Sequence, residues 1–280
     1  MRQWIVAVTL LFVLSGCSAR FVYNWMDWIV PWEVDDYVDL NRSQSKQLDA
    51  IIERTLAWHR VNELPQYIDH LDSLTAQLSS PISADHIQQQ LDRFGSHWNR
   101  LYDHLLPDII PLVQSLSEKQ VAQILSTVQE EEDELRQEYS ELSLNERIAK
   151  SNTSMRKGMK KRIGRLTAEQ KQLIEQYNEA RHRSLQQWFS YRDRYMALLR
   201  LALTERSNTE ALVARLQLLL IDYDQLKSKE HKQLLEYNQQ LFIANLAAIH
   251  HSLTDKQMKK LISDLTTLRD DFAYLAAKAQ

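Results

Sequence analysis

Turn-forming residues are scarce in this sequence, and their scarcity restricts the fold more than any other feature. The 280 residues include 4 Gly and 5 Pro, whereas about 7% and 5% are usual. Strands joined by tight hairpins need such residues at many turns, so an all-β fold is disfavoured. Leu, Gln, Ala, Lys, Arg and Glu are abundant, and all are good helix formers. We therefore predict an all-α protein.

Apolar residues recur every three or four positions over most of the chain, which places them on one face of successive helices. Residues 83–106 are predicted to form one helix, which Pro107 and Pro111 are expected to interrupt. Residues 167–203 and 208–253 are expected to form two long helices. A helix of about 40 residues is ~60 Å long. The predicted architecture is an elongated multi-helix bundle with long antiparallel helices.

The motif Leu-(Thr/Ser/Asn)-x-x-Gln occurs four times, beginning at Leu40, Leu116, Leu166 and Leu253. Its second residue fits a helix N-cap, and its Gln fits the third helical position of a capping box. The copies are too unevenly spaced for a solenoid repeat. The motif is predicted to mark helix starts. Whether the two full Leu-Thr-x-x-Gln copies also share a surface stays open.

The N-terminus has the features of a secretory signal. Arg2 precedes an apolar run, Trp4–Leu14, that is too short to cross a bilayer as a helix. The run leads into Leu14, Ser15, Gly16 and Cys17, which together resemble the lipobox of bacterial lipoproteins. The resemblance implies that residues 1–16 are removed and that Cys17, the only Cys, is lipidated. The single Cys also excludes an intramolecular disulfide.

The lipobox resemblance also implies a location. Such lipoproteins carry Ser, rather than Asp, after the lipidated Cys when they are sent to the outer membrane of Gram-negative cells. Ser18 therefore implies an outer-membrane protein on the periplasmic side, with the inner membrane as the alternative. Two or three acyl chains would hold it stably.

We predict that residues 17–40 form a lipidated N-terminal segment rich in aromatic residues, ahead of a helical domain at 41–280. The region near 143–166 is a candidate subdivision of that domain. Trp25, Trp28 and Trp32 share a helix face if Pro31 is tolerated. We expect the rings to pack on the helical body. Contact with lipid headgroups is the alternative, disfavoured because four neighbouring acids would face an anionic surface: Asp27, Glu33, Asp35 and Asp36.

An acidic block at 130–141 precedes a basic block at 150–165. The favoured interpretation is two solvated antiparallel helices with complementary charges. The alternative is a basic patch that binds an anionic glycolipid or a polyanionic partner. Its candidate residues are Lys157, Lys160, Lys161, Arg162 and Arg165.

Signatures of catalysis or metal binding are absent from the sequence. It contains no H-E-x-x-H, no C-x-x-C, no calcium loop, no glycine-rich phosphate loop and no G-x-S-x-G. His97 and His104 can share a helix face, but without a carboxylate at a fitting spacing they favour a structural role over a metal site. The formal charge of -3 gives no general affinity for nucleic acid. We expect no metal, no cofactor and no enzymatic activity.

Two family resemblances complete the sequence evidence. The repeated motif is similar to that of the Spy/CpxP-type periplasmic proteins, helical chaperones or regulators of envelope stress. Five segments resemble an uncharacterised family of proteobacterial lipoproteins: Tyr23-Asn24-Trp25, Asp27-Trp28, Asp35–Leu40, Trp58-His59-Arg60 and Glu63-Leu64-Pro65. We expect a non-catalytic binding or chaperone-like role in the cell envelope. The alternatives are a scaffold or regulator of one envelope protein and, ranked last, an enzyme acting on envelope glycans.

Overall fold

The structure is a computed structural model that describes residues 19–278. Over that range the backbone forms α-helices and one short 3-10 helix, without a β-strand, which confirms the all-α prediction. The elements in chain order are α2 (Ala19–Asn24), α3 (Met26–Asp35), α4 (Arg42–Asn62), α5 (Leu64–Leu78), α6 (Ala84–Gln114), α7 (Glu118–Glu141), α8 (Leu144–Ile163), α9 (Ala168–Ala180), α10 (Leu185–Thr204), α11 (Thr209–Leu220), η2 (Tyr223–Leu226), α12 (Lys229–His251) and α13 (Asp255–Ala277).

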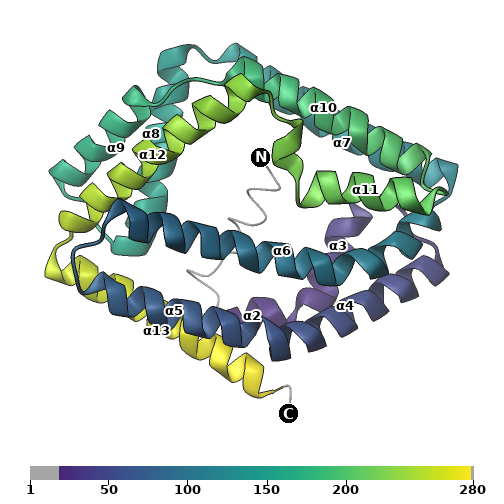
Figure 1. The fold of residues 1–280 in the computed structure, drawn as a ribbon, viewed down its shortest axis with the longest axis horizontal. Helices are drawn as coiled ribbons and strands as arrows, with labels where there is room; N and C mark the ends of the chain where they lie inside the picture. The colour runs from purple at the N-terminus through teal and green to yellow at the C-terminus, as the bar shows by residue number, and fades with distance from the viewer. Residues whose placement is uncertain (1–18, 279–280) are drawn as a thin grey trace.

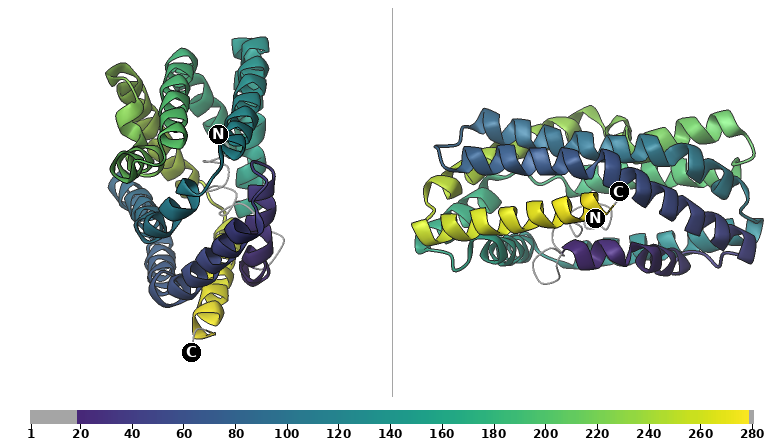
Figure 2. Two further views of the ribbon diagram at one scale, coloured as in Figure 1. Left: turned by 90° about the vertical axis from the view of Figure 1, so that its right-hand side faces the viewer. Right: turned by 90° about the horizontal axis from the view of Figure 1, so that it is seen from below.

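The helices follow one another around an elongated, flattened ring (Figures 1 and 2). The ring closes where α5 packs along α13, the most extensive helix pair in the described chain. Helix α2 also lies on α13. The backbone N–H of Ala19 donates to Oδ2 of Asp271 at 3.0 Å, and Arg20 pairs with the same carboxylate. The first and last described helices are therefore held together.

Buried apolar side chains gather in three clusters around the ring. The first lies between the start of α7 and the end of α10, the second between α6, α10 and α11, and the third between α8, α9 and α12. Their buried members are Val38, Leu116, Val121, Leu125 and Leu203; Tyr195, Ala202, Leu212, Leu216 and Leu219; and Ile163, Leu166, Ile174 and Ile249.

Helix α6 continues through both prolines and ends at Gln114, so the prediction that they interrupt it is wrong. Pro107 and Pro111 are exposed, and water can hydrate the carbonyls that each proline leaves without a partner. On the other side of the helix, Leu106 and Ile110 pack against the second cluster. This burial offsets the two lost hydrogen bonds and keeps the helix continuous.

Neither of the two long helices predicted in the second half of the chain is continuous. Residues 208–253 divide into α11, η2 and α12, because the Ser228 hydroxyl accepts from the N–H of His231 and starts a new helix. Helix α11 packs on α10 and buries its leucines in the second cluster, whereas α12, beyond the break, packs on α9 and α6. Residues 167–203 divide into α9 and α10 at a non-helical stretch, 181–184.

The acidic and basic blocks lie on α7 and α8, which do not pair along their lengths as predicted. Leu142 and Ser143 are both extended, so the chain turns a corner between the two helices. Helix α7 packs against α10, whereas α8 packs on α9 and α13. Lys150 and Glu138 form an ion pair near the corner. Glu132 of α7 instead pairs with Arg192 of α10, and Arg156 of α8 pairs with Glu175 of α9.

Trp25, Trp28 and Trp32 do not pack on the helical body, which corrects the favoured expectation. Their exposed fractions are 48%, 59% and 53%. Pro31 lies within α3, as a shared helix face requires, and the three rings contact one another. The opposite side of α3 faces the body, where Val34 packs on the first cluster.

Candidate functional site

Each Leu-(Thr/Ser/Asn)-x-x-Gln motif begins a helix, as predicted. The four capping boxes start α4, α7, α9 and α13. In each box the N-cap side chain accepts from the N–H of the Gln, and the Gln Oε1 accepts from the N-cap N–H. Ser143 and Glu146 form a further box at the start of α8, with Glu in place of Gln.

The motif glutamines then meet in pairs, which no sequence pattern indicated. Nε2 of Gln44 donates to Oε1 of Gln120 at 3.1 Å, and the reverse bond measures 2.7 Å. Each amide also donates to the carbonyl one residue before the partner's motif. Gln44 reaches Ser115 at 2.9 Å, and Gln120 reaches Asp39 at 2.7 Å. The starts of α4 and α7 are thereby joined.

The second pair repeats this pattern at the starts of α9 and α13. Gln170 and Gln257 donate to each other at 2.9 Å in both directions. Gln170 also donates to the carbonyl of Ser252 at 3.1 Å, and Gln257 to that of Arg165 at 2.9 Å. Both side chains are buried, with exposed fractions of 0% and 5%.

The amide pairs lie at opposite ends of the ring's long axis, where α3–α4 meets α6–α7 and where α8–α9 meets α12–α13 (Figure 1). Each glutamine uses both of its N–H groups and its carbonyl oxygen, which satisfies a buried amide. The motifs at Thr167 and Thr254 therefore share a buried junction rather than an outer surface. The hydrogen bonds of the paired glutamine amides hold the starts of these helices together.

A second buried polar group lies between α5 and α6. Nδ1 of His70 contacts Nε2 of His97 at 2.9 Å, and Nε2 of His70 contacts Oε1 of Gln90 at 2.7 Å. Arg100 contacts Nδ1 of His97 and also donates two hydrogen bonds to Glu63, at 2.7 and 2.9 Å. Glu63, His70 and His97 are exposed by 1%, 2% and 7%.

These contacts fix one consistent proton arrangement. Because Oε1 of Gln90 can only accept, His70 carries its proton on Nε2 and accepts at Nδ1 from His97. Nδ1 of His97 then accepts from Arg100. Both imidazoles are neutral in this arrangement. The pKa of His97 is lowered to about 4 by burial, by the His70 ring and by the Arg100 guanidinium. A neutral His97 is consistent with this low pKa.

The polar group extends toward the N-terminal helices. Tyr23 Oη lies 3.1 Å from Nδ1 of His59, and Tyr67 Oη lies 3.2 Å from its Nε2. Burial lowers the pKa of His59 to about 4 and raises that of Tyr23 to about 12. The Tyr67 ring also contacts His97 edge-on, with centroids 4.6 Å apart. We call this group, Tyr23, His59, Glu63, Tyr67, His70, Gln90, His97 and Arg100, the histidine–tyrosine network.

The network corrects the grouping suggested by the sequence. His97 meets His70 rather than His104, whose ring stacks on Trp58 with centroids 4.0 Å apart. The missed signal is the spacing of residues 59, 63, 67 and 70, which puts polar side chains on an inward helical stripe. Among residues 19–278, no cluster of three or more His, Cys, Asp or Glu could hold a metal ion.

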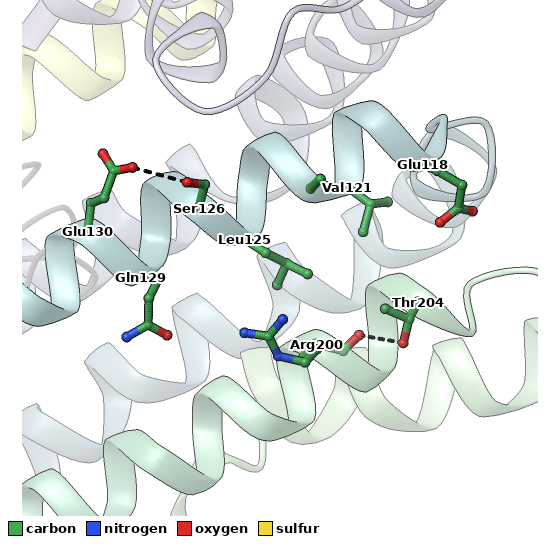
Figure 3. A pocket seen from close by; sticks show the side chains of 9 residues that line it. Glu118, Val121, Leu125, Ser126, Gln129, Glu130, Arg200 and Thr204 are labelled. Carbon is green, nitrogen blue, oxygen red and sulfur yellow. Dashed lines mark hydrogen bonds between the residues drawn. The ribbon is translucent and has the colours of Figure 1, made fainter.

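A surface groove runs between α7 and α10 (Figure 3). It encloses about 460 Å³ and is open to solvent. Val121 and Leu125 supply its apolar part, and Arg200 of α10 faces Gln129 of α7 across it (Figure 3). At one end, Arg206 joins the two helices by binding the carbonyl of Leu116 at 2.9 Å and the carboxylate of Glu118 at 2.7 Å.

A family model described as a family of unknown function, DUF6279, matches residues 36–232. The chain belongs to the DUF6279 family. The matched region contains the Gln44–Gln120 pair, most of the histidine–tyrosine network and the groove, whereas Gln257 lies beyond it. No curated protein and no solved structure shows significant similarity to this DUF6279 chain.

The predicted basic patch lies within the DUF6279 match, at the end of α8. Lys157, Lys160, Lys161 and Arg165 are exposed, whereas Arg162 is half-buried and burial lowers its pKa. Helix α13 adds exposed lysines beside the Gln170–Gln257 junction, Lys256 and Lys259.

The predicted processing residues Leu14, Ser15, Gly16 and Cys17 lie outside the described residues. Helix α2 begins at Ala19, two positions after Cys17, so the folded body starts next to the predicted lipidation site. Among the described helices, none is long and apolar enough to cross a membrane.

Proposed function

We propose that the protein is a lipid-anchored, periplasmic binding protein of the cell envelope, held at Cys17 on the outer membrane and without catalytic activity. The lipobox-like sequence ending at Cys17 supports the anchor. Spy/CpxP-like proteins share the repeated motif only, so their chaperone activity remains one version of the binding role.

The groove between α7 and α10 is the observation that carries the binding role. Val121 and Leu125 lie at its floor and expose little apolar surface, because both are buried in the first cluster. Its rim offers both charges through Glu118, Glu130 and Arg200, which suits a mainly polar partner surface. The Arg206 bridge fixes the end of the groove, so a partner would meet a preformed surface.

The distribution of exposed apolar side chains favours one specific partner over many unfolded clients. Outside residues 19–35, the large exposed apolar residues of the described chain lie on six different helices. A surface that holds unfolded chains needs a broad apolar patch. The isolated residues are Val61, Phe94, Leu144, Leu201, Tyr237 and Tyr274.

In-cell photo-crosslinking tests the proposal. A photoreactive amino acid at Gln129 lies in the groove, whereas one at Glu134 is exposed on the same helix outside the groove residues. We expect one dominant protein adduct from position 129 and little from position 134. Equal or absent adducts at the two positions would overturn the groove as the binding site.

The chaperone version makes a different prediction. A diffuse smear of adducts, together with suppressed aggregation of unfolded proteins at stoichiometric amounts, would support it over a single partner. Failure to suppress aggregation would remove that version and leave the scaffold version standing.

A further inference from the structure

Four exposed aromatic side chains form a continuous ridge along α2 and α3. Phe21 and Trp25 lie 5.6 Å apart between ring centroids, Trp25 and Trp28 meet edge-on at 6.2 Å, and Trp28 stacks on Trp32 at 6.2 Å. All four rings are about half exposed. We call Phe21, Trp25, Trp28 and Trp32 the aromatic ridge. A contiguous apolar patch of this kind marks a binding surface.

The ridge is held outward by contacts on the other side of the same helices. Tyr23 Oη donates to the carbonyl of Leu56 at 3.2 Å, and Ala19 is bound to Asp271. Val34 packs into the first apolar cluster. Because α2 and α3 are fixed in this way, the rings cannot turn inward without losing these contacts.

The position of the ridge in the chain points to its occupant. Phe21 follows Cys17 by four residues, a reach of at most ~14 Å when extended. Acyl chains on Cys17 would therefore keep the ridge close to the headgroup region, the zone of a bilayer that Trp side chains favour. This step rests on the proposed lipid anchor.

The charges beside the ridge select the kind of membrane surface. Asp27, Asp35 and Asp36 are exposed on or next to α3, and the neighbouring Arg20 is engaged by Asp271. Carboxylates are repelled by anionic headgroups but not by zwitterionic ones. Phosphatidylethanolamine-type surfaces thus fit the ridge better than phosphatidylglycerol or cardiolipin.

We propose that the aromatic ridge inserts into the headgroup region of a zwitterionic phospholipid bilayer and fixes the orientation of the ring on the membrane. Figure 2 shows α2 and α3 along one broad face of the ring, with α6 and α12 on the opposite face. The ridge face would lie against the membrane, and the opposite face would point into the periplasm.

Fluorescence quenching by brominated phospholipids tests the insertion. The mature protein, purified from membranes, is reconstituted into phosphatidylethanolamine–phosphatidylcholine vesicles with bromine near the headgroup end of the acyl chains. Trp4 lies in the predicted signal, so six of the seven Trp remain, and three of those are in the ridge. We expect quenching of up to about half of the emission, falling when the bromines lie near the bilayer centre.

Two variants assign the quenching to the ridge. Trp25→Phe/Trp28→Phe/Trp32→Phe keeps the ridge apolar and should lose nearly all of the quenching. Adding Tyr237→Trp to that variant puts a Trp at a position of comparable exposure on α12, the opposite face. Its emission should not be quenched.

The outcomes of these experiments distinguish failure of the ridge proposal from failure of the lipid-anchor proposal. Mass spectrometry of the purified protein reports acylation of Cys17 independently. An acylated protein whose Trp emission is unquenched would overturn the ridge proposal and leave the anchor intact. Quenching without acylation would refute the anchor alone. Quenching that requires anionic lipid, or crosslinking of two copies through the ridge in place of quenching, would also overturn it.

Discussion

Gln170 and Gln257 donate a hydrogen bond to each other at 2.9 Å in both directions, although 87 residues separate them. Each one also caps the helix in which it lies. One side chain thus completes a local capping box and a long-range junction. The same arrangement of Gln44 and Gln120 at the other end of the ring shows that the motif is used in pairs.

Replacing Gln170 by Ala should lower the free energy of unfolding by about 3 kcal/mol, because it leaves the Ser252 carbonyl and one N–H of the buried Gln257 amide without partners. Gln257→Ala should cost a similar amount. The double variant should cost less than the sum, with a coupling energy of about 1–3 kcal/mol. Urea unfolding of the four proteins measures this cycle.

Glu146→Ala is the matched control for the cycle. Glu146 completes the capping box of α8 but is exposed. Its replacement should destabilise the protein clearly less than Gln170→Ala. Strict additivity of Gln170→Ala and Gln257→Ala would show that capping alone explains the motif.

Interactions between residues close in sequence were easier to predict from the sequence than interactions between distant residues. The capping boxes at Asn41, Ser117, Thr167 and Thr254 were readable because cap and Gln are three residues apart. Their pairing was not, because nothing in one box specifies which distant box has a matching carbonyl. The path of the chain around the ring decides this.

The positions of several helix ends were predicted wrongly for a related reason. Pro107 and Pro111 looked like breaks by propensity, but burial on the opposite side of α6 overrides the cost of exposed prolines. Ser228 looked like part of a continuous helix, although its hydroxyl caps α12.

The contacts of the candidate site residues also depend on how distant helices pack. The contact between His70 and His97 depends on how α5 meets α6, which no spacing in the sequence encodes.

Among the carboxylates of the acidic block, Glu132 should be the one on which the stability of the fold depends most. It is 3% exposed and forms two hydrogen bonds with Arg192, whereas the sequence suggested a solvated face. Glu132→Gln should lower the free energy of unfolding by about 3 kcal/mol, because it leaves a largely buried guanidinium unpaired. Chemical denaturation measures the loss.

Two further variants separate the lost charge from lost packing. Glu134→Gln changes an exposed acid of the same block and should have little effect. Glu132→Met combined with Arg192→Leu should recover most of the stability, since no charge is then left buried. A loss from Glu134→Gln as large as that from Glu132→Gln would indicate a general charge effect instead.

Cys17→Ala should abolish processing of the precursor and its labelling by fatty acid. The thiol is the only group that can form the thioether to diacylglycerol, since Cys17 is the only Cys. Gel mobility and incorporation of labelled palmitate measure this. Ser18→Asp is the control, because it should leave lipidation intact and move the protein to the inner membrane. Normal processing of Cys17→Ala would refute the lipobox interpretation.

The histidine–tyrosine network should make stability fall as the pH drops from 7 to 5. The pKa of His97 is about 4 in the folded protein and about 6.5 in the unfolded chain. Between these values the unfolded state binds more protons than the folded state does. The free energy of unfolding therefore increases with pH in this range and decreases on acidification. His97 should contribute up to about 2 kcal/mol of the loss between pH 7 and pH 5.

Urea unfolding of the wild type and His97→Gln at both pH values isolates this contribution. The variant is expected to be less stable at pH 7, because Gln cannot reproduce both contacts of the imidazole, with His70 and with Arg100. The informative quantity is the change between the two pH values, which should be smaller in His97→Gln. His251→Gln alters an exposed histidine at the end of α12 and should keep the wild-type pH dependence. Equal pH dependence in all three proteins would show that protonation of His97 is not linked to folding.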